Sequence, residues 1–367
     1  MRALFYVSGH EYSGEVRMFC AAARGLAARR WEVTLVCPAD TSVEERATHD
    51  HGDYEIITIE SGGGLLAESW RLRQLMLDRF VEVCFVHGDR DHLAVALALR
   101  LAERGAVVRR LGVGERLRRR PAGRIAARLA TTGFLFSSAS DRNAAPTFAR
   151  GALEPGVAEP GVDAASYDEL RPITASALGA APSAQLLACV YSPGGRTRMA
   201  TVFRTIALLR ARHPALRLAI VGPGSDDQDL RMHAASLGIT PVVSHLGPQA
   251  NRLAVLRAAD LGWVVAGGDD AAFGCLDLMA MRLPVLAERA PVTEYYVADG
   301  IAGVLMPPGD AAATAARVAS ILSHDPERIA MGNAGHTRAA RDFTERAMID
   351  GFENAALAAR DRLRWLL

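Results

Sequence analysis

Residues 267–287, GGDDAAFGCLDLMAMRLPVLA, give the clearest indication of the fold of this chain. The apolar run 261–266 just before them predicts a buried strand. Gly274 predicts the start of a helix that ends before Pro284, and residues 285–287 then begin another strand. A strand, an acidic loop, a helix and a second strand within about twenty residues indicate an α/β protein.

The start of this predicted helix is a candidate anion site, because free N–H groups and the helix dipole favour negative charge there. The backbone groups concerned are those of Phe273, Gly274, Cys275 and Leu276. We expect Asp277 in the first helical turn and Asp269 at the end of the strand, where open α/β sheets bind their ligands. A phosphate site beside two carboxylates predicts binding of a nucleotide-sugar.

The same stretch resembles the signature of the retaining glycosyltransferases of the GT-B fold, family 4. That signature has two glutamates separated by seven residues, then an Ala-Met-Ala-like run and Pro-Val. Asp269 and Asp277 match the two glutamates, each one methylene shorter, and residues 278–280 and 284–285 match the rest. The resemblance implies transfer of a sugar from a nucleotide-diphosphate donor to an acceptor hydroxyl, with retention of configuration.

Length and composition limit the class of protein. A chain of 367 residues, half of them hydrophobic, predicts two domains with large cores. A net charge of +1 argues against a protein made mainly to bind nucleic acid. The chain has no lysine, so all 42 basic residues are arginine and any cation that binds phosphate must be one of these. The five cysteines are scattered through apolar segments and predict buried thiols.

The pattern of strands and helices runs through the chain twice, which predicts an N-terminal domain over 1–165 and a C-terminal domain over 183–345. The resemblance implies two Rossmann-like, doubly wound domains facing across a cleft. It also implies that a final helix over 346–367 crosses back to the N-terminal domain. No apolar run is long enough to span a membrane, so we expect a cytoplasmic protein. The basic tract Arg109–Arg128 suggests peripheral contact with the inner face of a membrane.

Acceptor-side residues are expected in the N-terminal domain. Ser13-Gly14 follows the first strand, and the resemblance places Gly14 against the donor. His87 and Asp89 follow the strand at 82–86, where the family has a histidine-containing loop, so His87 is also a catalytic candidate. A purely structural role for His87 and Asp89 is equally compatible with the sequence.

Donor-phosphate residues are expected in two loops of the C-terminal domain. The family's arginine and lysine positions are occupied here by Ser192 and Thr197. Arg196 and Arg198 lie beside these positions, and we expect Arg196 to hold the diphosphate. Gly222 opens the next glycine-containing loop, where the backbone can approach a ligand.

The mechanism implied is same-face attack, in which the departing phosphate oxygen takes the acceptor proton. Asp269 would contact the donor sugar and Asp277 the ribose. No metal-binding motif is evident, so we expect no metal ion or other cofactor. Three alternatives remain open: a degenerate protein that binds a nucleotide-sugar or glycan, a nucleotide-sugar epimerase, and a phosphorylase. The acceptor could be a glycan, a lipid or a small molecule, and the oligomeric state is open.

Overall fold

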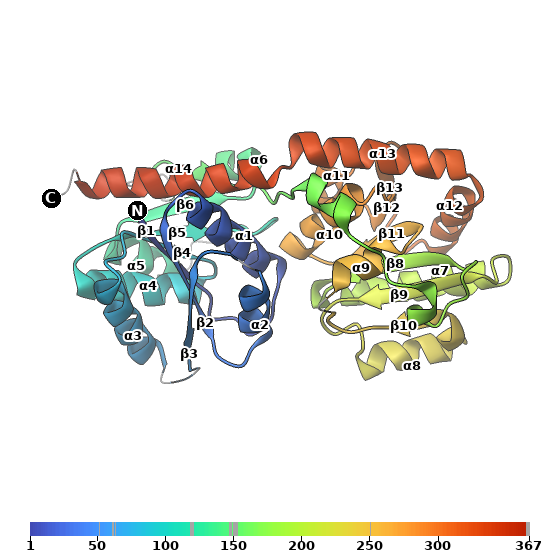
Figure 1. Ribbon diagram of the computed structural model, residues 1–367, viewed down its shortest axis with the longest axis horizontal. Helices are drawn as coiled ribbons and strands as arrows, with labels where there is room; N and C mark the ends of the chain where they lie inside the picture. Colours follow the sequence, from blue (N-terminus) through green and yellow to red (C-terminus); the bar gives the residue numbers. More distant parts are fainter. Residues whose placement is uncertain are drawn as a thin grey trace. The chain divides into compact units, whose positions relative to one another are not determined.

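The chain forms two compact units, seen in a computed structural model that describes residues 1–50, 52–60, 62, 64–117, 121–146, 149, 153–249 and 251–364. Unit 1 comprises Met1–Pro160 and Glu345–Leu367, and unit 2 comprises Gly161–Thr344. Each unit has one parallel sheet covered by helices (Figure 1). The expectation of two Rossmann-like domains is therefore confirmed.

Unit 1 has a seven-stranded sheet in the order β3-β2-β1-β4-β5-β6-β7. The strand bounds are β1 Arg2–Tyr6, β2 Glu32–Pro38, β3 Glu55–Ile59, β4 Val83–Val86, β5 Ala106–Arg110, β6 Thr132–Phe136 and β7 Gly156–Val157. From β1 the chain first builds toward β3 and then returns to add β4 on the other side of β1. The carboxyl ends of β1 and β4 therefore form a switch point, where open sheets of this kind bind ligands.

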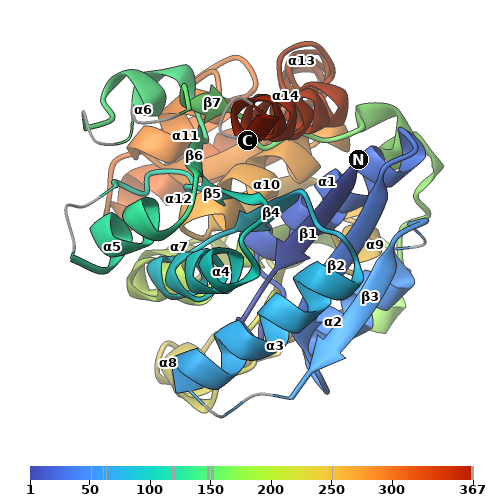
Figure 2. The ribbon, with the colours of Figure 1, turned by 90° about the vertical axis from the view of Figure 1, so that its left-hand side faces the viewer.

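Helices cover both faces of this sheet. Figure 2 shows α3, α4 and α5 on one face and α1 with α14 on the other. The helix bounds are α1 Gly14–Ala28, α2 Ser42–His49, α3 Gly64–Asp78, α4 Asp89–Ala102, α5 Pro121–Leu129, α6 Ala139–Asn143 and α14 Glu345–Arg364. Ser13 caps the N-terminus of α1 by accepting a hydrogen bond from the backbone N–H of Val16.

The last helix belongs to the core of unit 1, as expected from the sequence. Phe352 on α14 is fully buried, and its ring lies 6.0 Å from that of Phe5 and 5.3 Å from that of Phe85. A Cβ on Gly25 of α1 would lie 2.3 Å from Ile349, so only glycine allows the two helices to approach this closely. Residues more than 300 positions apart thus share one hydrophobic core.

Unit 2 has a six-stranded sheet in the order β10-β9-β8-β11-β12-β13, with its switch point between β8 and β11. The strand bounds are β8 Gln185–Tyr191, β9 Leu216–Val221, β10 Val243–His245, β11 Leu261–Val265, β12 Val285–Glu288 and β13 Gly303–Met306. The α-helix bounds are α7 Met199–Arg210, α8 Gln228–Ser236, α9 Arg252–Arg257, α10 Gly268–Ala280, α11 Pro291–Tyr296, α12 Ala311–Ser323 and α13 Asp325–Asp342.

Unit 2 also has short 3-10 helices, both before its first strand β8 and in the loops of its sheet. Their bounds are η2 Ala164–Glu169, η3 Ala175–Leu178, η4 Pro193–Arg198 and η5 Thr240–Val242. Residues 166–182, between the two expected domains, therefore contain η3 and end just before β8. The core of the unit is formed by apolar residues of β8, β9 and β11 packed against α7 and α12, including Phe203, Trp263 and Val318.

The basic tract at 109–128 is not one continuous surface, which corrects the expectation from the sequence. Arg109 and Arg110 lie in the buried strand β5, with exposed fractions of 3% and 0%. Residues 118–120 lie outside the described residues, as does the side chain of Arg124. In the part of the chain that the structure describes, no helix is both long and apolar enough to cross a membrane.

Replacing Phe352 by alanine should destabilise unit 1 by about 3–5 kcal/mol, because it empties the centre of an aromatic cluster. Urea unfolding followed by circular dichroism measures this change. Phe80→Ala is the matched control, because Phe80 is 55% exposed, and it should cost less than about 1 kcal/mol. Equal effects of the two substitutions would show that α14 is not part of the core.

Candidate functional site

Three loops meet at the switch point of unit 2, and glycine makes their approach possible. A Cβ on Gly195, after β8, would lie 1.9 Å from the carbonyl oxygen of Val265 on β11. A Cβ on Gly222, after β9, would lie 2.0 Å from the carbonyl oxygen of Tyr191, and its φ of +135° also favours glycine. The loops after β8, β9 and β11 are therefore held together at the carboxyl edge of the sheet.

The helix after β11 begins six residues earlier than the sequence suggested. Gly267 is the N-cap residue, and Gly268 opens α10 with a φ of +55°. Gly267 supplies no side-chain cap, so the first-turn N–H groups from Gly268 to Asp270 precede the helical hydrogen bonds, the first of which runs from Ala271 N–H to the carbonyl oxygen of Gly267 at 3.2 Å. Asp269 lies in this first turn and is buried. The helix dipole and Asp269 thus lie at the place where a ligand is expected.

The predicted anion site at residues 273–276 is wrong. Phe273, Gly274, Cys275 and Leu276 lie inside α10 and are buried, and their N–H groups are part of the helical hydrogen-bond pattern. Gly274 does not break the helix. A Cβ there would lie 3.1 Å from Val190 and 3.3 Å from Val264, so the glycine lets α10 pack closely on β8 and β11.

Asp277 lies in the middle of α10 and has no exposed surface. Its Oδ1 accepts a hydrogen bond of 2.6 Å from the hydroxyl of Tyr167, and its Oδ2 accepts one of 2.6 Å from the guanidinium of Arg252. The carboxylate therefore links α10 to η2 and α9. The expectation that it lies in the first turn is wrong. The sequence offered no signal for Tyr167 and Arg252, since each is distant along the chain.

Arg196 and Arg198 lie in η4, in the loop after β8. The guanidinium of Arg196 pairs with Asp227, at 3.3 Å, and with Asp229. Arg198 donates to the carbonyl oxygen of Gly194 at 3.3 Å. Half of the Arg196 side chain is exposed, so exchange of its partners costs little. Both arginines thus lie beside the crevice, and Arg196 is held there by carboxylates.

Unit 1 has a cavity of about 290 Å³ at its own switch point. The loop after β1 and the start of α1 contribute Ser8, Ser13 and Glu15, and the loop after β4 contributes His87 and Asp89. The structure therefore brings His87 and Asp89 to one cavity. Gly14 is buried at the first position of α1, directly beside this cavity. A cavity lined by hydroxyl, imidazole and carboxylate groups suits a ligand rich in hydroxyls.

His87 is held by two carboxylates that the sequence analysis missed. Its Nε2 lies 2.8 Å from Oε1 of Glu15 and 3.8 Å from Oε2 of Glu115. Burial and Arg110 lower the pKa of His87, but the hydrogen bond and charge of Glu15, with the charge of Glu115, raise it above the usual value of 6.5 overall. Its Nδ1 is buried and has no hydrogen-bond partner among the residues that the structure describes. The imidazole therefore holds its proton more readily than that of an ordinary histidine.

A buried arginine connects this histidine to Asp89. Arg109 donates to Oε1 of Glu115 at 2.9 Å and also pairs with Asp89. The backbone N–H of Gly112 donates to the other oxygen of Glu115 at 2.9 Å. Asp89 thus has a structural partner as well as a place on the cavity wall. No short sequence motif predicts this network, because Arg109 on β5 lies about twenty residues after Asp89, the first residue of α4.

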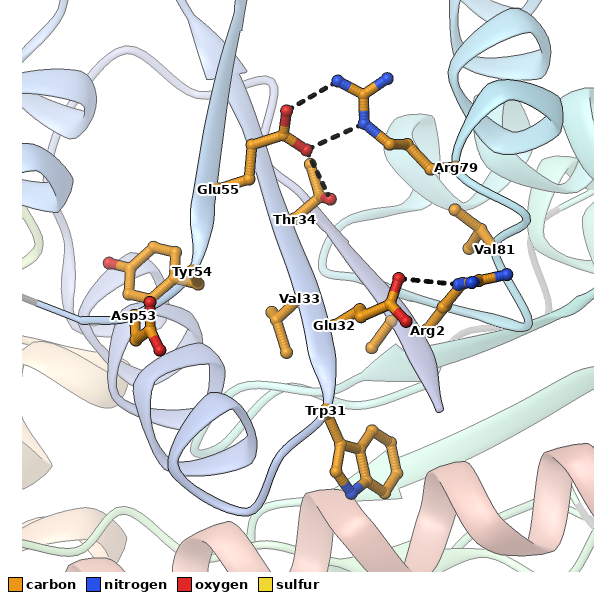
Figure 3. Close-up of a pocket in the computed structure, with 11 residues that line it drawn as sticks. Arg2, Trp31, Glu32, Val33, Thr34, Asp53, Tyr54, Glu55, Arg79 and Val81 are labelled. Carbon is orange, nitrogen blue, oxygen red and sulfur yellow. Dashed lines mark hydrogen bonds and ion pairs between the residues drawn. The ribbon is translucent and has the colours of Figure 1, made fainter.

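A second cavity of about 300 Å³ lies at the opposite, amino edge of the same sheet (Figure 3). Figure 3 shows that its charged groups pair with each other: Arg79 with Glu55, at 2.6 and 2.9 Å, and Arg2 with Glu32, at 2.8 Å. Because these charges are already compensated and the cavity is far from the carboxyl ends of the strands, we do not assign it to the functional site.

No group of three or more histidine, cysteine, aspartate or glutamate side chains among the described residues is arranged to hold a metal ion. The five cysteines are buried free thiols, and burial raises the pKa of Cys275, for example, to about 12. Cys275, inside α10, is therefore a poor candidate for a thiolate nucleophile.

Gly195→Ala should destabilise unit 2 by about 1–3 kcal/mol, because the new methyl group collides with the Val265 carbonyl. Gly194→Ala is a matched control in the same loop. Its Cβ would have no neighbour closer than 3.5 Å, so stability should be nearly unchanged. Urea unfolding of both variants tests whether the loops after β8 and β11 are in contact, and equal stabilities would contradict it.

Glu15→Gln should lower the pKa of His87, because it removes the charge that favours the imidazolium. A histidine whose pKa is raised on folding stabilises the protein fully below its unfolded pKa, near 6.5, and this contribution is lost as pH rises through the folded pKa. NMR titration of the His87 ring measures the shift. Glu11→Gln, a change to another acid of the same cavity, should leave it unchanged. An unaltered titration in Glu15→Gln would show that this pair does not form.

Comparison with known proteins agrees with this architecture. Residues 190–324 match the family Glycosyl transferases group 1. The chain is 25% identical to the lipopolysaccharide core biosynthesis glycosyltransferase LpsE of Rhizobium meliloti, over 41% of this chain and 44% of LpsE. The chain thus spans less than half the length of the curated relatives that it matches.

Solved structures resemble the chain over nearly its whole length. HepE of Anabaena, in complex with UDP and glucose, has a TM-score of 0.76 and 17% identity, with 96% of this chain and 98% of HepE covered. WaaG, a glycosyltransferase involved in lipopolysaccharide biosynthesis, has a TM-score of 0.67 and 16% identity, with 97% and 99% covered. At these identities the likeness establishes the fold. The matched residues 190–324 include all three loops of the unit 2 switch point, so this segment is similar to the glycosyl transferases group 1 family, and the chain as a whole has the GT-B fold of these structures.

Proposed function

We propose that this protein is a retaining glycosyltransferase that transfers a sugar from a nucleotide-diphosphate donor to an acceptor hydroxyl. The observation that carries the proposal is the convergence of the loops after β8, β9 and β11 at one switch point, inside the segment that matches the family. This crevice has uncapped helical N–H groups, two arginines and a buried carboxylate. These groups suit a diphosphate joined to a sugar.

The donor binds in unit 2 in this proposal, and a UDP-sugar is the first candidate, since HepE has been solved in complex with UDP and glucose. The diphosphate lies against the start of α10, at Gly268–Ala271, instead of residues 273–276. Arg196 and Arg198 supply the positive charge that stabilises the leaving phosphate, so no metal ion or cofactor is required. To bind phosphate, Arg196 exchanges Asp227 and Asp229 for it.

The two carboxylates of α10 have different roles in this proposal. Asp269 lies in the first turn, where it contacts hydroxyls of the donor sugar or stabilises developing positive charge. Asp277 has both oxygens engaged by Tyr167 and Arg252 and has no exposed surface. We therefore assign it a positioning role, in which it fixes α10 relative to η2, in place of contact with ribose.

The acceptor binds in the cavity of unit 1, beside His87 and Asp89. The imidazole, held by Glu15 and Glu115, orients the acceptor hydroxyl. The departing phosphate oxygen takes the proton of that hydroxyl, so the new bond forms on the face that the leaving group occupied. The acceptor class, whether a glycan, a lipid or a small molecule, is not part of this proposal.

Calorimetric titration with UDP, GDP, ADP and dTDP, followed by turnover assays with the matching sugar donors, tests the donor site. We expect one nucleotide series to bind, and Arg196→Gln to weaken it about tenfold or more, because a charge-assisted hydrogen bond is lost. Asp269→Asn should lower turnover by at least about a hundredfold, with a smaller effect on nucleotide binding. Arg204→Gln, a change at an exposed arginine of the adjoining helix α7, is the matched control.

One observation favours a second candidate, a protein that binds a nucleotide-sugar without turnover. Arg196 is already paired with two aspartates, and the family's lysine position is Thr197. Donor binding without sugar release in the presence of any acceptor would support that candidate. Turnover of the donor without an acceptor would instead indicate an epimerase or hydrolase. The absence of nucleotide binding in folded protein would refute the proposed function.

A further inference from the structure

Unit 1 has a further cavity, of about 310 Å³, at the carboxyl edge of its sheet. The last residues of three neighbouring strands line it: Tyr6 of β1, Pro38 of β2 and Ile59 of β3. Helix α3 contributes Glu68 and Arg71 to its wall. Open α/β sheets bind ligands at the carboxyl ends of their strands, so the position of this cavity indicates a binding site. We call it the β1–β3 cavity.

The β1–β3 cavity adjoins the cavity that contains His87. Ser8 and Arg90 line both cavities, so these two residues form the wall that the cavities share. The backbone N–H of Ser8 donates to Oδ2 of Asp91 at 3.3 Å, and its hydroxyl donates to Oδ1. These bonds hold the loop after β1 against the start of α4. A ligand in one cavity therefore has the other cavity as its immediate neighbour along the sheet edge.

Glu68 is the buried charged group of the β1–β3 cavity, with an exposed fraction of 7%. Its Oε1 accepts a hydrogen bond of 2.6 Å from the hydroxyl of Tyr6, and its two oxygens accept from the two terminal nitrogens of Arg90. Burial and the hydrogen bond to Glu68 raise the pKa of Tyr6, so the phenol keeps its proton. The cavity thus has donors and acceptors in fixed positions, as recognition of hydroxyl groups requires.

The charges along the β1–β3 cavity balance, which limits the class of ligand. Among the described residues, two glutamates and two arginines line it. Arg90 compensates Glu68. Glu60 and Arg71 are exposed, and Arg71 donates to the backbone carbonyl oxygen of Glu60 at 2.9 Å. A phosphate or carboxylate ligand is favoured where positive charge is in excess, which these four residues do not provide. An uncharged ligand rich in hydroxyls fits this balance.

We infer that the β1–β3 cavity binds a neutral sugar unit of the acceptor, next to the unit that reacts beside His87. The acceptor is then a glycan chain of at least two sugar units. This inference rests on the proposed function, which places the acceptor in the cavity of His87. A lipid tail fits less well, because it would cover the pair of Glu68 and Arg90 without forming hydrogen bonds to it.

Binding of the full chain to an array of neutral glycans of one to four sugar units tests this inference without nucleotide or turnover. Calorimetry then compares the glycan that binds best with its terminal sugar alone. We expect the longer glycan to bind at least about tenfold more tightly, because the second cavity adds hydrogen bonds to charged groups. Arg71→Gln should weaken binding of the longer glycan about tenfold and leave binding of the single sugar unchanged.

Arg73→Gln is the matched control on the same helix. The Nε of Arg73 donates to the carbonyl oxygen of Leu101 at 3.1 Å, and Arg73 is not part of the cavity wall, so this variant should bind both ligands as the wild type does. Circular dichroism verifies that each variant is folded. The inference is overturned by absence of binding to any glycan, by equal affinity for the longer glycan and the single sugar, or by an Arg71→Gln variant that binds the longer glycan normally or loses both ligands equally.

Calorimetry with UDP on the same protein separates this inference from the proposed function. Binding of UDP together with equal affinity for long and single glycans would refute the inference alone. Absence of binding to any nucleotide, with the preference for the longer glycan and its loss in Arg71→Gln intact, would refute the proposed transferase and not the second sugar site.

Discussion

The close approach of three backbone segments at the switch point of unit 2 is the constraint on which the candidate site depends. Gly195 lies directly under the Val265 carbonyl, and Gly222 lies against that of Tyr191. Any side chain at these places would separate the loops after β8, β9 and β11. With the loops in contact, the start of α10, the carboxylate of Asp269 and the arginines of η4 lie at the same carboxyl edge of the sheet. The positions of the site side chains therefore depend on this close packing of the backbone.

Electrostatic pairing determines which of these groups can act. Asp277 is fully buried with Tyr167 and Arg252, and a buried carboxylate with two donors is a stable structural link that a ligand would have to break at high cost. Arg196 is paired too, but at the surface, where exchange for a phosphate costs little. In the proposed function, this difference in burial assigns Asp277 a positioning role and Arg196 a ligand-binding one, although the sequence pattern predicted both as site residues.

In unit 1, too, charged side chains pair at the switch point of the sheet, but the central group is a histidine. Its switch point holds His87 between Glu15 and Glu115, and the latter is bound to the buried Arg109. The result is a histidine that keeps its proton more readily than a free imidazole. On the far side from α14, which completes the apolar core through Phe352, the helices α3 and α4 leave apolar and cationic side chains exposed.

The two α/β units and the placement of His87, Asp89, Arg196 and Asp269 near strand ends were predictable from the sequence, because hydrophobic periodicity marks the strands and ligands bind at the carboxyl edge of parallel strands. The return of the last helix was implied only by the resemblance to a known family. Only the tertiary structure decided that α10 begins at Gly268, that Gly274 serves packing, and that Arg109 is buried. Such features depend on contacts between residues far apart in the chain, which no local pattern records.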